Sequence, residues 1–278
     1  MMRYHGHATM MTTDLQQREI TSQAEARVVS ELETGQRRTV TTTEVAAMID
    51  APVASQRVRD VVALLRKHGW LHPLPLRGAY EFQPAVGGPY PSGDPWLELR
   101  VALARHPEAW AHVGLGSAAF LRRLADRRPV PDTVVWLAEH RVPPGLLRAY
   151  RVVRCAPDRF FGSSLIDGLP VATPERIALE VALWPVYAGD LRNSEHWVRE
   201  VLQRVDVDAV ADGARRLGPT VTGRLGYLAE TFDASAVAEA LAHLPRTHPV
   251  WLGPRAEPPK HYDSRWGVYD TIGIGGVG

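Results

Sequence analysis

An α+β fold in two parts is predicted by three observations on this 278-residue sequence. Residues 20–84 combine short helical patterns with alternating strand patterns, and a stretch rich in Pro and Gly follows at residues 85–95. Residues 96–272 then mix β-branched runs with longer helical ones. With 45% hydrophobic residues, both parts can bury a core. We therefore expect an N-terminal domain, a linker and a mixed α/β C-terminal domain.

The start of the chain is expected to be a disordered extension, because residues 1–19 are largely polar. His5 and His7 form an H-x-H pair with no further ligand nearby, so we expect no metal site there. Residues 1–13 lack the apolar core of a signal peptide, and no apolar run approaches the roughly 18 residues of a membrane span. These features favour a cytoplasmic protein without a membrane partner.

Two short helices are expected to open the N-terminal domain. The first begins at residues 21–22 and ends at Gly35, and its expected inner residues are Ala26, Val29 and Leu32. The second follows candidate N-caps at residues 41–43, and residues 50–52, Asp-Ala-Pro, end it.

A third helix carries the clearest pattern in the chain. Four apolar residues recur at i, i+3, i+4 and i+7, which predicts one buried stripe. They are Val58, Val61, Val62 and Leu65. Ser55 is a candidate N-cap and Gly69 a candidate for the end of this helix.

A hairpin with a basic tip is predicted next. Residues 70–74 and 79–82 alternate like strands around residues 75–78, which include Arg77. Two helices joined by a Pro-containing turn, followed by such a hairpin, are typical of a winged helix-turn-helix whose second helix enters a DNA groove. The exposed face of that helix would offer cations, an amide and a small side chain to base edges. Its residues are Gln56, Arg59, Ala63 and Arg66.

Charge supports a DNA-binding role for this block. Between residues 37 and 82 there are seven Lys and Arg against four Asp and Glu, which leaves +3, whereas the whole chain has +1. Cations are thus concentrated where phosphates would lie. The candidate DNA-binding residues are Arg37, Arg38, Ser55, Gln56, Arg57, Arg59, Arg66, Lys67 and Arg77. The alternative is a protein-interaction module whose arginines form a solvated face.

Strands and helices are expected to alternate in the C-terminal domain. Asp94-Pro95 combines an N-cap with a first-turn proline, so a helix should start at Trp96. Gly116-Ser117 is a candidate cap for a helix that runs to about Asp126. The runs with β-branched and aromatic character predict strands. They are residues 133–138, 150–155, 169–172, 250–252 and 266–269.

The remaining segments of this domain are predicted to be helical or flexible. Thr173-Pro174-Glu175 provides an N-cap, a first-turn proline and an acid near the positive end of the helix dipole. Residues 193–244 are expected to be helical, with breaks near Asp206, Gly218 and Asp233. The glycine-rich residues 273–278 should form a flexible tail.

No combination of residues in the C-terminal domain indicates catalysis. Residues 114–119 lack both the Gly-Lys-Ser/Thr ending of a phosphate loop and the G-x-S-x-G of a nucleophile elbow. A nuclease of the restriction type would need Glu-x-Lys, and the two lysines, Lys67 and Lys260, lack that spacing. The single cysteine, Cys155, excludes an intramolecular disulfide and a cysteine-rich zinc site. We therefore expect no enzyme, no cofactor and no metal.

The order of these signals resembles the AbiEi-type antitoxin family of bacterial toxin-antitoxin systems. The likeness covers roughly residues 20–272 and depends on the order of five runs: residues 76–82, 116–119, 173–180, 223–228 and the strand around Trp266. The family motif, carried over by position, comprises Ser117, Thr173, Glu175, Arg176, Arg224 and Tyr227. A structural role is the expectation for most of these residues. The family pattern explains neither the N-terminal extension nor the glycine tail.

Two activities are implied by the resemblance. The N-terminal domain would bind inverted repeats in double-stranded DNA at its own promoter and repress the operon. The C-terminal domain would neutralise a nucleotidyltransferase-type toxin, either by binding it or indirectly. The alternative is a stand-alone one-component regulator whose C-terminal domain senses a small ligand, and a weaker third hypothesis is a DNA-processing enzyme.

Overall fold

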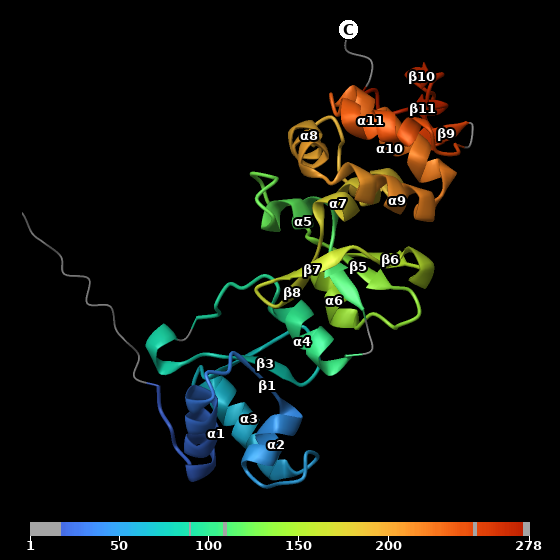
Figure 1. Cartoon of the computed structure of the whole chain (residues 1–278). Coiled ribbons are helices and arrows are strands. Elements are labelled where there is room, and N and C mark those ends of the chain that lie inside the picture. Colours follow the sequence, from blue (N-terminus) through green and yellow to red (C-terminus); the bar gives the residue numbers. More distant parts are fainter. Residues whose placement is uncertain (1–17, 89, 108–109, 247–248, 275–278) are drawn as a thin grey trace, which may run out of the picture. The chain divides into compact units, whose positions relative to one another are not determined.

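The computed structural model describes residues 18–88, 90–107, 110–246 and 249–274 and shows an α+β protein, as the sequence predicts (Figure 1). The chain divides into two compact units, Met1–Val101 and Ala102–Gly278. The boundary between them falls within helix α4 (Leu97–Arg105). The H-x-H pair, most of the predicted extension and the end of the predicted tail lie outside the described residues. Among the described residues, no helix is both long enough and apolar enough to cross a bilayer.

Three helices and a three-stranded antiparallel sheet form the first unit. The helices are α1 (Gln23–Thr34), α2 (Thr42–Met48) and α3 (Gln56–Lys67), and the strands, in the order β1-β3-β2, are β1 (Thr39–Thr41), β3 (Ala79–Phe82) and β2 (Leu71–Pro73). The predicted stripe of α3 is buried and packs into one core with α1, α2 and the aromatic pair Trp70 and Phe82. A short 3-10 turn, Ala85–Gly87, follows the sheet.

Side-chain caps start all three of these helices. Ser22 accepts a hydrogen bond from the backbone of Glu25, and Ser55 accepts one from Val58. The C-cap of α3 is His68, one residue before the predicted Gly69. Gly69 follows it with a φ of 75°, in the left-handed region that favours glycine. The prediction that Ala26 lies inside α1 is wrong.

Helical phase explains the error at Ala26. The helix buries Glu25, Val28, Val29 and Leu32, which recur at i, i+3, i+4 and i+7, and this phase turns Ala26 toward solvent. The last two residues of the predicted N-terminal extension, Arg18 and Glu19, also contact this unit. Arg18 donates to the carbonyl of Gln83, and the indole of Trp70 donates to the carbonyl of Glu19 at 3.2 Å.

A five-stranded mixed sheet lies at the centre of the second unit, in the order β6-β5-β4-β8-β7. Its strands are β4 (Ala111–Val113), β5 (Thr133–Leu137), β6 (Arg151–Cys155), β7 (Ser163–Ile166) and β8 (Leu169–Ala172). β4 pairs antiparallel with β5 and parallel with β8. The strands β5, β6 and β8 confirm the predicted strand runs.

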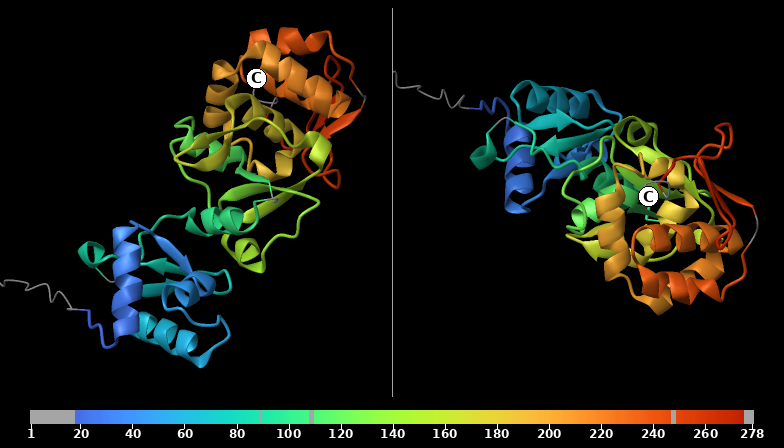
Figure 2. Two further views of the ribbon diagram at one scale, coloured as in Figure 1. Left: turned by 60° about the horizontal axis from the view of Figure 1, so that its bottom comes forward. Right: turned by 90° about the horizontal axis from the view of Figure 1, so that it is seen from above.

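The helices of this unit are organised around α7. They are α5 (Leu115–Leu121), α6 (Pro144–Ala149), α7 (Pro174–Leu183), α8 (Glu195–Arg204), α9 (Val207–Leu217), α10 (Pro219–Thr231) and α11 (Ser235–Ala242), with 3-10 turns at Pro157–Arg159 and Pro185–Tyr187. Helix α7 contacts α5 and β8 as well as α8, α9 and α10, so it links the sheet to the helical layer drawn in orange in Figure 2. The breaks between α8 and α11 fall where the sequence predicts them.

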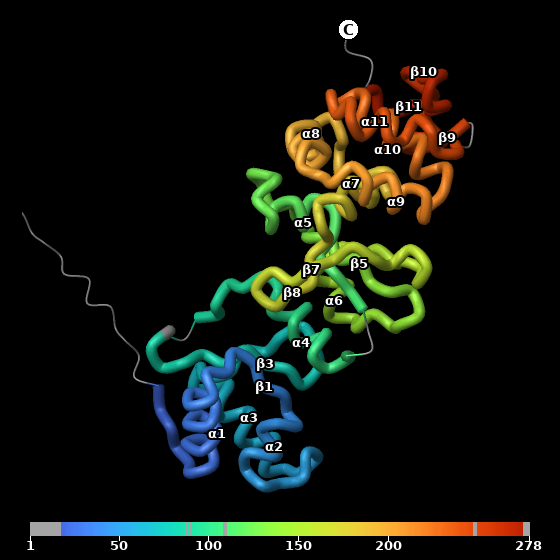
Figure 3. Tube along the Cα trace, viewed as in Figure 1, coloured from blue at the N-terminus to red at the C-terminus, as the bar shows by residue number. Residues whose placement is uncertain are grey.

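A second, three-stranded sheet packs on α10 (Figure 3). Its order is β10-β11-β9, from β9 (Val250–Leu252), β10 (His261–Asp263) and β11 (Val268–Asp270). The buried Trp266 lies against Gly226, where an added Cβ would be 2.0 Å from the indole ring. Gly226 is therefore required for the close approach of sheet and helix.

Several boundaries in the second unit differ from the prediction. Helix α5 begins at Leu115 and ends at Leu121, so Gly116 and Ser117 lie inside it and do not cap it. The last strand begins at Val268, because Trp266 and Gly267 form the turn that follows β10, with Gly267 at a φ of 64°. The elements β1, β7, β10 and α6 were not predicted, because all are short, and β7 and β10 are also largely exposed and lack an apolar pattern.

We predict that Gly226→Ala destabilises the protein by about 1–3 kcal/mol, because the new methyl group must displace the Trp266 ring. In a helix without that contact the same change stabilises by about 0.5–1 kcal/mol. Gly116→Ala is the matched control, since its nearest neighbours would be 3.7 Å away, at ordinary contact distance. Chemical denaturation measures both variants. Equal responses would contradict the tight packing at Gly226.

Candidate functional site

The outer face of α3 exposes the side chains predicted to touch DNA. Gln56, Arg59, Ala63 and Arg66 are all exposed. The Arg59 guanidinium donates to the Gln56 amide oxygen at 2.8 and 3.1 Å and to the Ala54 carbonyl at 2.6 Å. The Gln56 amide nitrogen in turn donates to Asp60 at 2.6 Å. The start of α3 therefore carries a connected polar network, and Arg59 must exchange hydrogen bonds to reach a base.

The other predicted DNA-binding residues lie on several elements of the same unit. Arg38, Arg57 and Lys67 are exposed, and Arg77 is exposed in the turn that joins β2 and β3. Ser55 has the capping role predicted for it, since its hydroxyl accepts from Val58 N at 3.3 Å. The unit thus presents guanidinium and ammonium groups from α3 and from the hairpin turn.

Arg37 is engaged within the fold. Its guanidinium forms an ion pair with Glu44, whose carboxylate also accepts the Thr41 N–H at 2.7 Å in a capping box at the start of α2. Burial acts to raise the pKa of Glu44, but the hydrogen bonds from Arg37 and Thr41 outweigh it and hold this pKa below its usual value. Arg37 therefore stabilises the start of α2 in addition to any contact with DNA.

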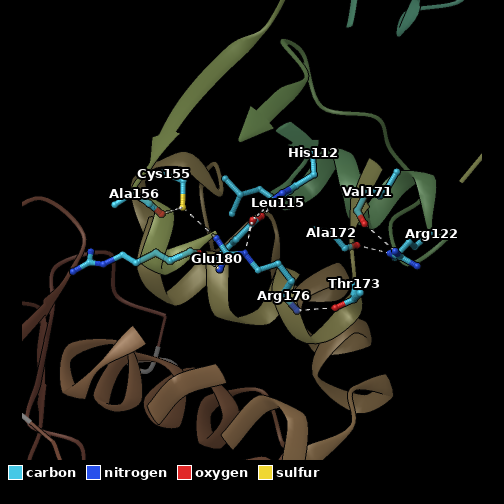
Figure 4. Close-up of polar contacts among 11 residues, drawn as sticks. His112, Leu115, Arg122, Cys155, Ala156, Val171, Ala172, Thr173, Arg176 and Glu180 are labelled. Atoms are coloured by element: carbon cyan, nitrogen blue, oxygen red, sulfur yellow. Dashed lines mark hydrogen bonds and ion pairs between the residues drawn. The ribbon is translucent and has the colours of Figure 1, made fainter. Parts of the chain in front are cut away.

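A buried ion cluster joins three elements of the second unit. Arg176 and Glu180 are one turn apart on α7, their side chains are 0% exposed, and Nε of Arg176 donates to Oε1 of Glu180 at 2.9 Å. Nε2 of His112, on β4, lies 2.7 Å from the same oxygen (Figure 4). The backbone N–H of Leu115 donates to Oε2 at 2.9 Å. One carboxylate thus holds β4, the first residue of α5, and α7.

Backbone geometry around Leu115 depends on this carboxylate. Leu115 has a φ of 51°, an uncommon left-handed conformation for a leucine that costs on the order of 1–3 kcal/mol. Gly114 precedes it, and a Cβ there would lie 2.7 Å from Oε2 of Glu180. The absence of a side chain at Gly114 lets the carboxylate approach, and the hydrogen bond from Leu115 fixes the turn from β4 into α5.

The rest of the Arg176 side chain is also enclosed. Nη1 donates to the Arg159 carbonyl at 2.8 Å, Nη2 lies 3.8 Å from the Cys155 sulfur, and the guanidinium stacks on Phe161, 4.9 Å from the ring centroid. Burial raises the pKa of the Cys155 thiol, and the nearby Arg176 offsets this only in part. A buried thiol with a raised pKa is a weak nucleophile.

The sequence identified Arg176 but missed Glu180 and His112. A signal for Glu180 was present, because an acid four residues after Arg176, within the otherwise apolar run of residues 177–183, needs a buried partner. No comparable signal points to His112, which lies 68 residues before Glu180 in the chain. Among the described residues, no group of three or more His, Cys, Asp or Glu is arranged to hold a metal ion.

The remaining motif residues connect other pairs of elements. Ser117 donates to Asp132 at 3.1 Å and accepts from the Thr133 N–H at 2.9 Å, which joins α5 to the start of β5. Thr173 caps α7, and Glu175 accepts the N–H of Asp206 at 3.1 Å, just before α9. In this structure these motif residues hold elements together.

Arg224 and Tyr227 attach the C-terminal sheet to α10. Arg224 donates to the carbonyls of Trp251, at 2.7 Å, and Ala182, at 3.1 Å. The Tyr227 hydroxyl donates to the buried Asp270 at 2.9 Å. Burial raises the pKa of Tyr227, and the Asp270 carboxylate raises it further, so the hydroxyl remains a donor.

A hollow of about 340 Å³ lies beside α10 and α11. It is a candidate effector site for the alternative function, a regulator whose C-terminal domain senses a small ligand. Charged side chains dominate its lining: Glu230, Asp233, Ser235, Ala238, Glu239 and Arg265. Arg265 pairs with Glu230 and Arg199 pairs with Asp233, at 2.7 and 2.6 Å. Small-molecule sites are mostly apolar with a few convergent polar groups, so this hollow does not favour an effector site.

We predict that Glu180→Gln lowers the free energy of unfolding by about 3–5 kcal/mol, because it leaves the buried Arg176 guanidinium without a counter-charge. The matched control is Glu31→Gln, since Arg27 and Glu31 have the same i,i+4 order but are about half exposed. That change should cost less than about 0.5 kcal/mol. Chemical denaturation compares them, and a similar loss in both variants would contradict the importance of burial.

Acid should weaken the cluster. Burial alone acts to raise the pKa of Glu180, but attraction to His112 and Arg176 and the hydrogen bonds from His112 and Leu115 outweigh it, so the folded-state pKa lies below the usual value. The stabilisation is therefore complete above the unfolded-state pKa, about 4.3, and is lost as the pH falls through the folded-state pKa. Melting temperatures from about pH 6 to pH 3 should fall less steeply in Glu180→Gln than in the wild type. Parallel curves would show that Glu180 does not contribute.

Comparison with known proteins points to a family for the second unit. Residues 111–231 match the family model of the AbiEi antitoxin C-terminal domain, and this span contains the whole ion cluster. No curated protein matches the sequence.

A solved structure, the RV2827C protein from Mycobacterium tuberculosis, has a similar fold, with a TM-score of 0.76 and 20% sequence identity over 92% of this chain and 94% of that chain. The likeness therefore extends to most of both chains at the level of the fold. Residues 111–231 are therefore similar to the C-terminal domain of AbiEi antitoxins.

Proposed function

We propose that this protein is the antitoxin of a bacterial toxin-antitoxin pair and represses its own operon. The observation that carries the proposal is the match of residues 111–231 to an antitoxin domain. An antitoxin counteracts a toxin, so the family implies a toxin partner. We further propose that this toxin is of the nucleotidyltransferase type, as the sequence resemblance implies, and that the protein acts in the cytoplasm as a regulator without catalysis, cofactor or metal.

The DNA-binding part of the proposal concerns residues 20–84. Three helices and a hairpin are arranged there in the order of a winged helix-turn-helix, with α2 and α3 as the two helices of the motif and Arg77 at the tip of the wing. The exposed face of α3 and its arginines support binding in the major groove of inverted repeats. The proposed DNA contacts are Arg38, Gln56, Arg57, Arg59, Arg66, Lys67 and Arg77, with Arg37 and Ser55 supporting the helix starts.

The toxin-directed part of the proposal concerns residues 96–272. Five of the six motif residues bond to other elements of the second unit: Ser117, Glu175, Arg176, Arg224 and Tyr227. Thr173 caps its own helix, α7. We therefore propose that the motif residues do not contact the toxin themselves. Instead, we propose that they keep a separate toxin-binding surface of this unit in a fixed shape.

Binding of the purified protein to a labelled duplex tests the repressor function. The duplex carries the stretch upstream of its own gene, and a scrambled duplex is the comparison over a salt series. A repressor should prefer its own site by about 10³–10⁷-fold and show a steep salt slope. Equal, weak binding to both duplexes would overturn the repressor function and favour a protein-interaction module.

We predict that Arg59→Ala weakens binding to the specific duplex by about 1–3 kcal/mol and binding to the scrambled duplex much less, because Arg59 lies on the reading face. Arg77→Ala, at the wing tip, should weaken both duplexes together and lower the salt slope by about one, as a phosphate contact does. Equal losses on both duplexes for Arg59→Ala would reassign it to the phosphate backbone.

A further inference from the structure

Strand β7 forms one end of the five-stranded sheet and has an open edge. In the part of the chain that the structure describes, its one neighbouring strand is β8, which pairs with it antiparallel. Asp167 and Gly168 join the two strands in a tight turn, with φ values of 48° and 73° that are typical of a two-residue hairpin loop. The side chains of Ser163, Ser164 and Leu165 are exposed, and that of Leu165 is 70% exposed. An exposed edge of this kind can pair with a further strand.

The register with β8 decides which backbone groups of β7 face outward. The N–H of Thr173 donates to the carbonyl of Gly162 at 2.9 Å, so these two residues form a hydrogen-bonded pair. Because hydrogen-bonded and non-hydrogen-bonded pairs alternate along antiparallel strands, Ser163 and Leu165 do not bond to β8. The residue opposite Leu165 is Pro170, which has no N–H to donate. The backbone N–H and C=O groups of Ser163 and Leu165 therefore point away from the sheet, along its edge.

This edge lacks the charged residues that oppose strand pairing elsewhere in the sheet. The sequence of β7 is Ser-Ser-Leu-Ile, without a charged residue or a proline. At the other end of the sheet, β6 carries Arg151 and Arg154. The Arg122 guanidinium donates to Ser164 Oγ at 2.6 Å and to the Val171 carbonyl of β8 at 3.0 Å, which holds β7 in place. The open edge is thus fixed in position and has no charge on its own strand.

We propose that β7 pairs antiparallel with β7 of a second copy of this chain, around a two-fold axis at Ser164. In this register Ser163 of each copy lies opposite Leu165 of the other, so all the outward N–H and C=O groups of these residues find partners. The choice of a second copy rests on the proposed repressor function, because inverted repeats bind two copies related by a two-fold axis. Four residues bury little surface, so we expect the pairing to be weak in solution.

Disulfide cross-linking of the full chain, with oxidised glutathione and without DNA, tests this pairing. Ser164→Cys places a thiol on the proposed axis, where directly opposite Cβ atoms lie about 4.5 Å apart, within reach of a disulfide. The native Cys155 is buried. Ser264→Cys is the matched control, because Ser264 is exposed in the turn between β10 and β11. Ser164→Cys should form covalent dimers about tenfold faster than Ser264→Cys, because pairing raises the local thiol concentration.

Two second changes in the Ser164→Cys protein separate edge pairing from other association. Leu165→Lys places two like charges close to the axis and should slow cross-linking by about 5–10-fold. Leu147→Lys changes a leucine that is 58% exposed on α6, and it should leave the rate unchanged. Circular dichroism checks that each variant is folded. Equal rates for Ser164→Cys and Ser264→Cys, or for the two lysine variants, would overturn the proposal.

Duplex binding by the wild-type protein is measured separately, so that the two proposals can fail independently. Slow cross-linking of Ser164→Cys together with specific binding to the promoter duplex would overturn the pairing and leave the repressor function standing. Fast cross-linking that Leu165→Lys slows, together with equal and weak binding to both duplexes, would support the pairing and overturn the repressor function.

Discussion

The second unit depends on one buried carboxylate. Glu180 lies where water does not reach, and it accepts a guanidinium N–H and a backbone N–H while it contacts an imidazole. A buried charge without such partners costs several kcal/mol, so the three elements that supply them cannot separate independently. The carboxylate thus fixes the turn from β4 into α5 and the position of α7. Helix α7 then serves as the support on which α8, α9 and α10 pack.

A second set of contacts extends this support to the C-terminal sheet. Helix α10 holds this sheet by close packing and by hydrogen bonds. Gly226 leaves room for the Trp266 ring, while Arg224 bonds to β9 and Tyr227 bonds to Asp270. All of these groups are used internally, so the surface available to a partner consists of other residues. In the first unit the arrangement is reversed. There the apolar stripe of α3 is internal, and its polar residues face outward.

Local patterns in the sequence were sufficient to predict α3, because its apolar residues, its N-cap and its terminal glycine all indicate one helix. Local patterns failed at α5, because the helix begins at Leu115 in a left-handed conformation whose backbone N–H bonds to the distant Glu180. The partnership of His112 and Glu180, 68 residues apart, is likewise created by sheet pairing and not by any local pattern. The contacts of Tyr269 with Tyr262 and Trp251 join three separate strands, so they become visible only once the register of those strands is known.

The most direct measurement is the growth of cells that induce any nucleotidyltransferase-type protein whose gene lies next to the gene of this protein, with and without co-expression of the full chain. Wild-type protein and the triple variant Arg59→Ala, Arg66→Ala and Arg77→Ala should restore growth equally at matched protein levels, because toxin neutralisation is assigned to the other unit. Failure of the wild type to restore growth, or the absence of any such neighbouring gene, would contradict the antitoxin function.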